Sequence, residues 1–536
     1  MNQAINSNAS RPLGVVDGAG ELVSENPSPR PQTMPAGYRR VVSGTIWSAS
    51  SRVASILASL LSTAFVTRYL GAEMYGIWSL ANSIIAYLGV TEMGTGNAST
   101  KFAAEKHARR DEAGEVAVVW TTFLITLIPA GTGILVMMFA AGHIVGEVFG
   151  IPEHLQPIAA TAVRLAAISF GAQLFVGVFN TPQLVRLRIK LFESWNAGFM
   201  LAQHGSIVIV VYVGWDIRGV LGVVTAYALL RALVQAFVSR SLLPTLFRPR
   251  IDTTLLRPIL RFAKGIVMSL LLGIILTSIE KFFLTRFCSI RDLGYYALAE
   301  RIATLLNIIP FALKQILMPV FSALHAGSEK SRIENLYSQA MRTILFCGLP
   351  VAILICASAE PFLRIWAGAE FAEHSSIPLY ILITGCMCGI MGYVPHSLLL
   401  ASGRTETIAR CYFIEIIPYV ICASILTFKF GAAGAAIAAS LRMLFEAILF
   451  FKAARWETGL PLRILSGDWR IYGIALLTIV GAAAASVCIG ENPVGRMANA
   501  VASCALFCGL VWTIILEPGE RRALLQIIRP QSGRAQ

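Results

Sequence analysis

The fold is decided by two similar stretches, FVTRYLGAEMYGIWSLANSI at residues 65–84 and FLTRFCSIRDLGYYALAERI at residues 283–302. Aligned without a gap, they are identical at seven positions, so the chain repeats at an offset of 218 residues. Each copy lies between long apolar runs of membrane-spanning length. Duplicated helix bundles placed side by side in a bilayer are a recurrent architecture of secondary transporters, with the substrate site between the repeats. The repeat therefore predicts an all-α, polytopic membrane transporter.

Composition supports a membrane location and excludes several other classes. The chain is 56% hydrophobic and only 14% charged, which is too apolar for a soluble protein of 536 residues. Its net charge of +14 comes from basic residues spread over short loops, as expected for orientation signals, so no nucleic-acid partner is predicted. The ten cysteines lie mostly inside apolar runs without metal-ligand spacing, and neither a metal nor another cofactor is expected.

A helix needs roughly 20 apolar residues to cross a bilayer, and about fourteen such windows fit this chain. The pair on either side of Gly431 is the most closely spaced. The windows are 42–66, 74–98, 116–141, 158–180, 194–214, 219–243, 264–288, 293–322, 341–363, 377–401, 411–428, 431–452, 471–490 and 497–516.

The distribution of charge predicts the orientation. If the N-terminus is inside, most of the 44 Lys and Arg residues fall on inner segments, which places both termini in the cytoplasm. An even number of helices per repeat puts both repeats the same way up, related by a pseudo-twofold axis along the membrane normal, with a central cavity between them. The predicted organisation is a disordered tail at 1–41, an N-lobe at 42–243, a linker at 244–263, a C-lobe at 264–452, a cytoplasmic loop at 453–470, two extra helices at 471–516 and a cytoplasmic tail at 517–536.

Three segments resemble a known superfamily. They are RYLGAEMYGIWSLANSIIAYLGVTEMGTGNASTKFAAE at 68–105, LGYYALAERIATLLNIIPFALKQILMPVFSAL at 293–324 and FLRIWAGAEFAEHS at 362–375. Together they resemble the polysaccharide transporters, including O-antigen flippases, of the multidrug, oligosaccharidyl-lipid and polysaccharide flippase superfamily. The resemblance implies a flippase that moves a polyprenyl-diphosphate-linked oligosaccharide across the bacterial inner membrane. The product would be O-antigen lipopolysaccharide, exopolysaccharide or capsule, and membrane lipids, a polymerase and glycosyltransferases would be its partners.

Three alternatives stay open at this stage. A lipid II flippase is the nearest neighbour within the superfamily. A drug or cation antiporter of the superfamily is disfavoured. By family resemblance such proteins have twelve helices and an acidic residue in the first helix, whereas the first helix here carries Arg52. A membrane glycosyltransferase or polymerase would need catalytic groups on a large outer loop, and neither the outer loops nor the motifs GxxxxGK[ST], HExxH and GxSxG supply them.

One face of the first predicted helix is polar along its length. Successive positions at offsets of 0, 4, 7, 11 and 14 stay within roughly 40° of one line at about 100° per residue. An arginine near the bilayer centre costs about 2.5–3.5 kcal/mol on insertion scales, so it should face a wet cavity or an anion. Alternatively, it extends to the inner headgroups or bonds neighbouring carbonyls. The residues of this face are Ser48, Arg52, Ser55, Ser59 and Ser62.

The second repeat places charged groups at corresponding positions. The offset aligns Ser62 with Glu280, and in the next helix Glu300, Asn307 and Lys314 recur every seven residues and share a face. A Glu and a Lys bonded across a lobe interface is the alternative to a cavity role. Arg442 and Glu446, four residues apart, predict an internal ion pair.

A diphosphate concentrates negative charge, and guanidinium groups match its oxygens with paired hydrogen bonds. Arg52 is therefore the first candidate for binding it, followed by the cations of the second repeat. Carboxylates in apolar spans could bind a coupling proton or sodium ion. The candidate substrate-binding residues are Arg52, Ser55, Ser59, Lys281, Glu300, Arg301, Asn307 and Lys314, and the candidate coupling residues are Glu280 and Glu415.

Overall fold

The computed structural model describes residues 36–92, 95–327, 329–460 and 492–510, with a few isolated positions elsewhere in the C-terminal part. Side chains are described from Val53 onward, with gaps that include residues 262–270. The N-terminal tail up to residue 35 and the C-terminal tail lie outside the described residues, as does almost all of the helix expected at 471–490. The side chain of Arg52 lies outside them too.

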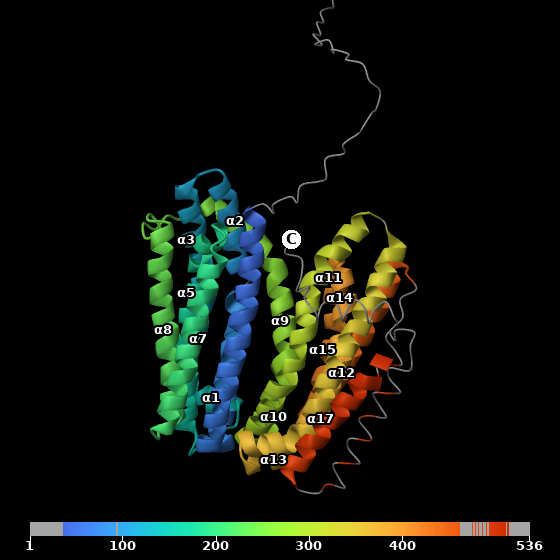
Figure 1. The fold of residues 1–536 in the computed structure, drawn as a ribbon. Coiled ribbons are helices and arrows are strands. Elements are labelled where there is room, and N and C mark those ends of the chain that lie inside the picture. Colours follow the sequence, from blue (N-terminus) through green and yellow to red (C-terminus); the bar gives the residue numbers. More distant parts are fainter. Residues whose placement is uncertain are drawn as a thin grey trace, which may run out of the picture.

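All regular structure in the described residues is helical (Figure 1). The helices of the predicted N-lobe surround α5, which is the most deeply buried of them. These helices are α1 (Ala36–Gly89), α2 (Thr95–Ala108), α3 (Glu112–Phe139), α5 (Gln156–Phe179), α7 (Ile189–Tyr212) and α8 (Ile217–Leu242), with short turns at α4 (Ala141–His143) and α6 (Thr181–Val185).

The predicted C-lobe is formed by a second series of helices, of which α13 packs between α12 and α15. Helix α17 packs outside α12, and Figure 1 shows it at the edge of this lobe. The series is α9 (Leu256–Phe287), α10 (Ile290–Ala303), the 3₁₀ turn η4 (Thr304–Asn307), α11 (Ile308–Ala326), α12 (Lys330–Trp366), α13 (Ala369–Met391), α14 (Tyr393–Ala401), α15 (Thr405–Thr458) and α17 (Pro493–Leu510).

Seven of the described helical stretches are long and apolar enough to cross a membrane. Two of them contain a reversal of direction at a glycine, Gly71 in α1 and Gly431 in α15. Both glycines have positive φ, which side chains with a Cβ rarely tolerate, so α1 and α15 each fold into two antiparallel segments. The predicted separation of spans on either side of Gly431 thus agrees with the structure, while the total of about fourteen stays a prediction.

Two expected helices are interrupted where the prediction had each as one continuous span. The helix expected at 293–322 is divided by η4, and the helix expected at 377–401 ends at Met391 and restarts at Tyr393. A proline ring clashes with the carbonyl four residues earlier. For Pro310 this carbonyl belongs to residue 306, within η4. For Pro395 it belongs to Met391, the last residue of α13.

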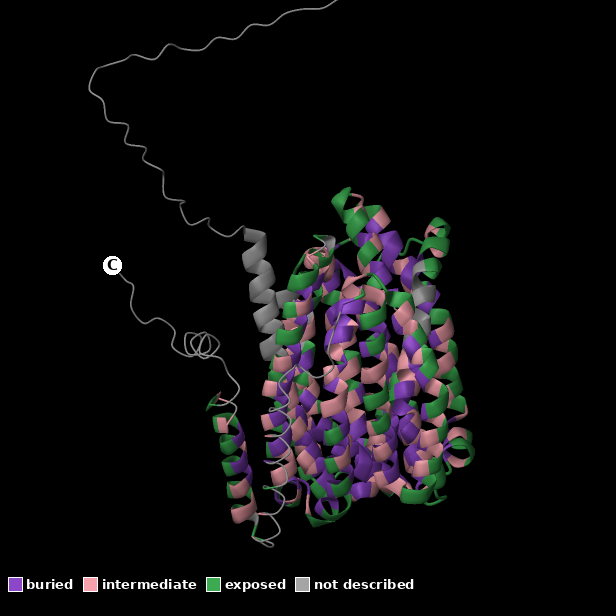
Figure 2. Ribbon diagram, turned by 90° about the vertical axis from the view of Figure 1, so that its right-hand side faces the viewer, coloured by how far each residue is buried: buried purple, intermediate pink, exposed green. Residues whose placement is uncertain are grey.

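Burial is arranged as in a protein that meets lipid on its outer surface. Figure 2 shows buried residues concentrated inside the bundle and exposed ones on its periphery. Large apolar side chains are exposed on outward faces, among them Phe139, Phe237 and Phe428. In water these exposed aromatic surfaces would be unfavourable, whereas hydrocarbon accepts them.

The two lobes meet at the lower end of the view in Figure 1, where α1 packs against α10. Gly76 lies against the carbonyl of Ile290, and Gly294 lies against the carbonyl of Ala72. Adding 218 to 72 gives 290, and adding 218 to 76 gives 294. Each contact is therefore the repeat equivalent of the other, which is the reciprocal pattern of a twofold interface.

An ion pair lies at the centre of this contact. The Arg291 Nη2 is 3.0 Å from the Glu73 Oε1, and the two residues are themselves 218 positions apart. A residue can contact its own repeat equivalent only near the pseudo-twofold axis. Together with Tyr75 packed edge-on against Phe371, these residues close the lower end between the lobes. We call this contact the lower seal.

The first helix of the C-lobe begins against the N-lobe. Ile259 of α9 is buried in one cluster with Ala98 and Ile125 of α2 and α3, and further along α9 packs on α15. The helix starts at Leu256, inside the range expected for a linker. α9 therefore spans from one group of helices to the other.

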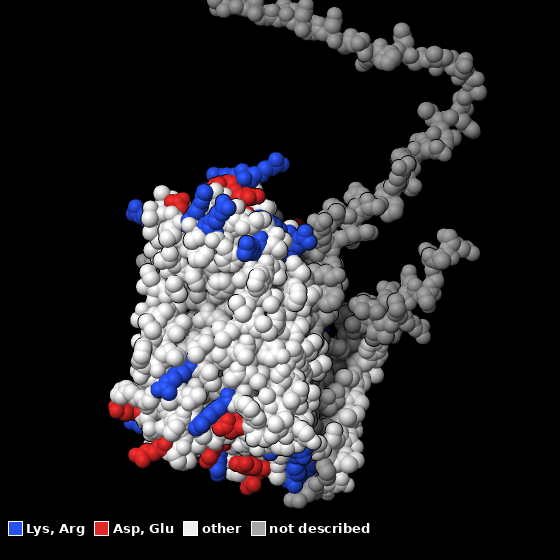
Figure 3. Space-filling view, turned by 90° about the vertical axis from the view of Figure 1, so that its left-hand side faces the viewer, with Lys and Arg blue, Asp and Glu red and all other residues white. Residues whose placement is uncertain are grey.

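The two ends of the molecule differ in charge. Figure 3 shows mainly Lys and Arg at the upper end and side chains of both signs at the lower end. Upper loops carry the exposed residues Arg109, Arg110 and Arg248, whereas Glu147 and Asp216 are exposed on lower loops.

Candidate functional site

Two cavities lie on either side of α10, and Glu300 and Thr304 line both. The first, of about 410 Å³, lies between the lobes and is called the interlobe cavity. Its lining comes from α1, α7 and α8 on one side and from α9, α10 and η4 on the other. The residues are Thr63, Tyr75, Trp78, Ser79, Asn82, Ser83, Ala86, Met200, Gln203, His204, Val224, Ser278, Lys281, Ala297, Glu300, Arg301 and Thr304.

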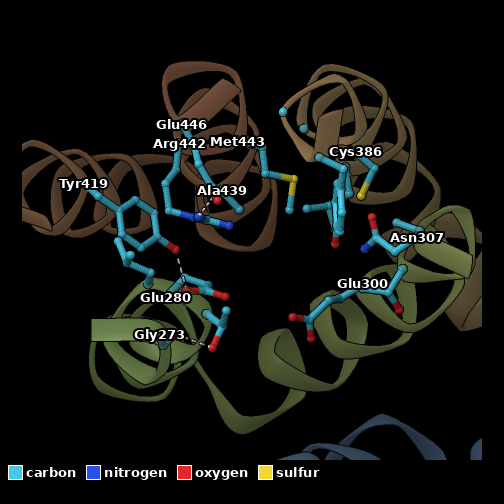
Figure 4. A pocket seen from close by; sticks show the side chains of 18 of the residues that line it. Gly273, Glu280, Glu300, Asn307, Cys386, Tyr419, Ala439, Arg442, Met443 and Glu446 are labelled. Atoms are coloured by element: carbon cyan, nitrogen blue, oxygen red, sulfur yellow. Dashed lines mark hydrogen bonds and ion pairs between the residues drawn. The ribbon is translucent and has the colours of Figure 1, made fainter. Parts of the chain in front are cut away.

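The second, of about 420 Å³, lies within the C-lobe and is called the C-lobe cavity (Figure 4). Figure 4 shows Arg442 of α15 pointing into it, with Glu280 of α9 on one side and Glu300 and Asn307 across the opening. Lys314, Tyr393 and His396 also line it. Its charged groups thus come from α9, α10, α11 and α15.

The two cations of the interlobe cavity have different surroundings. The Lys281 Nζ lies 2.8 Å from a Glu300 carboxylate oxygen, so its charge is already matched. The sequence left open that a Glu and a Lys bond to each other, and the structure joins Lys281 to Glu300 in this way. Within the described residues, Arg301 is exposed to the cavity with no carboxylate within ion-pair distance. Arg301 is therefore free to bind an added anion.

The polar face of α1 reaches the cavity by a different residue than expected. Ser59 is buried with a hydroxyl that has no hydrogen-bond partner among the described residues, and Ser55 is half-buried. Neither belongs to the described lining, which takes Thr63 from this stretch. The Ser62 Oγ lies 2.8 Å from the Nδ1 of His204, which holds the imidazole at the cavity.

Glu280 is held by two tyrosine hydroxyls. The Tyr419 hydroxyl donates to one carboxylate oxygen at 2.5 Å and the Tyr296 hydroxyl donates to the other at 3.2 Å. Only 2% of Glu280 is exposed. Ser62, the repeat equivalent of Glu280, makes the corresponding link to His204 in the N-lobe. The second repeat thus has a carboxylate held by two tyrosine hydroxyls where the first has a serine hydroxyl bonded to an imidazole.

Arg442 lies between two carboxylates. Its Nη1 is 2.7 Å from Glu446, as the spacing of four residues predicts, and 3.7 Å from Glu415. Glu415 is 1% exposed, and neither of its carboxylate oxygens has a hydrogen-bond partner among the described residues. An anion buried this way is costly unless it gains a proton or a closer cation. Glu415 is therefore a group whose state can change.

The seven-residue stripe is brought to one place despite the break in its helix. Glu300, Asn307 and Lys314 all line the C-lobe cavity. Lys314 lies over the ring of Tyr393, with its Nζ 5.9 Å from the ring centre. η4 changes the helical repeat between the first and last of these residues, so their common orientation depends on the interruption as well as on the spacing.

Several cavity residues were not predicted from the sequence. The repeat itself contained a signal, because Asn82 and Ser83 are the equivalents of Glu300 and Arg301 and line the same cavity. Gln203 and His204 of α7 had no such signal, since no motif marks them. The tyrosines around Glu280 were likewise indistinguishable from ordinary apolar positions.

Solved transporter structures share this fold. The chain superposes on a structure of the lipid II flippase MurJ in an inward closed conformation with a TM-score of 0.68, at 12% identity, covering 88% of this chain and 100% of that one. An inward-facing MATE family multidrug resistance transporter of the MOP superfamily gives 0.64, at 16% identity, covering 76% and 94%. The protein is an all-helical, multi-pass membrane protein of this fold.

Sequence comparison gives the family. Residues 65–376 match the family model described as polysaccharide biosynthesis protein. A putative O-antigen transporter of Shigella flexneri is 22% identical over 416 residues, which cover 76% of this chain and 96% of that one. The chain belongs to this polysaccharide biosynthesis family, whose members are transporters and not enzymes. The resemblance read from its motifs is thereby confirmed.

Proposed function

We propose that this protein is a flippase that moves a polyprenyl-diphosphate-linked oligosaccharide across the bacterial inner membrane for the synthesis of a surface polysaccharide. The observation that carries the proposal is Arg301, an exposed cation without a carboxylate partner in a polar cavity between the two lobes. Membership in a polysaccharide biosynthesis family supports the nature of the cargo.

The charges of the cavity suit a diphosphate better than a cation. Arg301 offers a planar donor group that can bind two phosphate oxygens at once. Lys281 adds a second positive charge nearby, although it must then be shared with Glu300. Arg52, on the same helix as Thr63, remains a further candidate. A diphosphate entering the cavity would thus be compensated mainly from α9 and α10.

Movement follows from the arrangement of the lobes. The lower seal closes one end of the interlobe cavity, so a cargo must leave either by the upper end or after the seal opens. Basic loops at the upper end favour a cytoplasmic position for it, together with both termini. We infer that the described conformation is sealed toward the outside, and that export requires Gly76 and Gly294 to separate from the carbonyls opposite.

Coupling to an ion gradient is assigned to the C-lobe cavity. Glu280 lines this cavity, and the buried Glu415 lies 3.7 Å from Arg442, which also lines it. Among the described residues, neither carboxylate has a cation within hydrogen-bond distance. Binding of a proton or sodium ion at either would change the charge beside Arg442. Since Glu300 lines both cavities, that change would reach the cargo site through the Lys281–Glu300 pair.

A lipid II flippase or a drug antiporter is the competing function. Both belong to the fold class, and a lipid II flippase would use the same diphosphate chemistry. An antiporter for cationic drugs would need an unpaired carboxylate at the cargo site, whereas Glu300 is paired with Lys281, and Arg301 has no carboxylate partner among the described residues. The geometry therefore favours an anionic cargo.

The test is genetic and biochemical. Deletion of the gene should abolish the surface polysaccharide and leave lipid-linked oligosaccharide on the cytoplasmic leaflet. Wild-type protein should restore export, whereas Arg301→Gln at equal membrane abundance should not; Arg52→Ala tests the other candidate in the same strain. If the Arg301 variant exported normally, the cavity would not bind the diphosphate as proposed.

A further inference from the structure

The two walls of the interlobe cavity differ chemically although they descend from one repeat. The C-lobe wall carries Lys281, Glu300 and Arg301, whereas the described residues of the N-lobe wall include no Asp, Glu, Lys or Arg. The difference is visible position by position at the offset of 218. In the alignment of the two repeats, Asn82 corresponds to Glu300, Ser83 to Arg301 and Trp78 to Tyr296.

The N-lobe wall combines aromatic rings with hydrogen-bonding groups. Trp78 is half-buried and packs edge-on against Tyr75, with ring centres 6.0 Å apart at 73°. Asn82 is exposed, and its amide nitrogen donates to the Trp78 carbonyl at 2.9 Å, which leaves its side-chain oxygen to accept from a ligand. From α7 opposite, Gln203 and His204 complete the wall.

Such a surface matches a neutral sugar. A pyranose ring has an apolar C–H face that packs on an aromatic ring and an equatorial rim of hydroxyls that pair with amide and imidazole groups. The Nδ1 of His204 is already engaged by Ser62, so its Nε2 is the atom that can meet a hydroxyl. An acidic sugar would find no Lys or Arg among the described residues of this wall.

We propose that the N-lobe wall, centred on Trp78, Asn82 and His204, is a subsite for a neutral sugar next to the diphosphate. The inference rests on the proposed function, since the diphosphate on the Arg301 wall sets which sugar reaches Trp78. A cavity of about 410 Å³ falls at the small end of ligand sites. It therefore holds the sugar nearest the lipid, and the rest of the oligosaccharide lies toward the open end.

The experiment compares binding of two kinds of lipid to the purified full-length protein. One probe is a bare polyprenyl diphosphate, and the others carry a single hexose, N-acetylhexosamine or deoxyhexose on that lipid. Wild-type protein should bind at least one glycosylated probe more tightly than the bare one. Trp78→Leu and Asn82→Leu should each reduce this preference, by about tenfold for the aromatic truncation, and leave binding of the bare lipid unchanged.

Controls separate this inference from the proposed function. Trp215→Leu removes an exposed tryptophan that is not among the described lining of the cavity, and this variant should retain the preference. Arg301→Gln should weaken all probes together; if the bare lipid does not bind even to the wild type, the proposed function fails. If the bare lipid binds and no glycosylated probe is preferred, or if Trp78→Leu keeps the preference, the sugar subsite is refuted while the flippase proposal stands.

Discussion

The lower seal gives the most quantitative prediction. A methyl group at Gly294 would lie 3.2 Å from the carbonyl carbon of Ala72 and 3.3 Å from the amide nitrogen of Gly76, and closer still to the Ala72 oxygen. These are backbone atoms, which cannot rotate away, so Gly294→Ala must separate α1 from α10. Overpacking of this kind costs about 1–3 kcal/mol. The sealed conformation should therefore lose population by roughly 5- to 150-fold relative to the open one.

The equivalent glycine of the first repeat offers a second variant that tests the lower seal. Gly76→Ala meets the Ile290 carbonyl in the equivalent way and should shift the population by a similar amount. Gly131→Ala in α3 is the matched control, because a Cβ there meets no atom within 4 Å. A helix interior gains about 0.5–1 kcal/mol when Gly becomes Ala. Loss of helix stability therefore cannot explain the shift.

The population is measured by pulsed electron spin resonance in lipid nanodiscs. Spin labels replace Glu147 on a lower loop of the N-lobe and Glu373 at the lower end of α13, both of which are exposed. Gly294→Ala and Gly76→Ala should each add or enlarge a long-distance population that Gly131→Ala lacks. Distance distributions unchanged from wild type in folded Gly294→Ala protein would refute the role given to the seal.

Three further predictions concern charged residues. Cysteines at Glu73 and Arg291, whose charged groups lie 3.0 Å apart, should be bridged by a short bis-methanethiosulfonate reagent, which would stop export until reductant removes it; export that continues in the cross-linked protein would contradict alternating access at the seal. Glu115→Ala should lower the stability of the detergent-solubilised protein by about 3–5 kcal/mol, because it leaves Arg186 without the fully buried carboxylate that it contacts at 2.5 and 3.1 Å. Thermal melting measures this loss, with Lys106→Ala as the control because that variant breaks only a partly exposed ion pair. An equally small loss of stability in both variants would argue against the prediction. Arg301→Lys should retain part of the diphosphate binding that Arg301→Gln loses, because the charge remains without the planar fork; equal loss in both variants, by direct lipid binding, would show that the charge alone is insufficient.

Much of the fold could be predicted from the internal repeat and the apolar windows of the sequence. The repeat at an offset of 218 predicted a pseudo-twofold relation between the lobes, and the reciprocal contact of α1 with α10 has the pattern that such an axis gives. Gly76 and Gly294 of this contact are among the identical positions of the repeat. Helices α3, α5, α7 and α8 begin and end within about five residues of the apolar windows, whereas α9 and α12 begin well before theirs. The interruption at η4 was not predicted, because a 3₁₀ turn before Pro310 leaves the hydrophobicity of the segment unchanged.

The candidate site was less predictable, for a physical reason. Sequence spacing places residues on one helix face, but a cavity is lined by faces of different helices, and the angles between helices are set by packing. The spacing did bring Glu300 and Lys314 to one cavity. It did not show that Lys281 would be paired with Glu300, nor that Arg301 would have no carboxylate partner among the described residues. The hydrogen-bonding residues of α7 had no pattern at all.

Direct transport by the purified protein is the decisive measurement. Proteoliposomes would contain a labelled polyprenyl-diphosphate-linked oligosaccharide in both leaflets, and impermeant periodate would oxidise only sugar on the outside. The account predicts that wild-type protein exposes the inner-leaflet pool to periodate, that Arg301→Gln protein does not, and that protein-free vesicles keep the pool protected. If the wild-type pool stayed protected under proton and sodium gradients of either direction while the same vesicles exchanged a cationic drug, the protein would be an antiporter, and the central claim would be wrong.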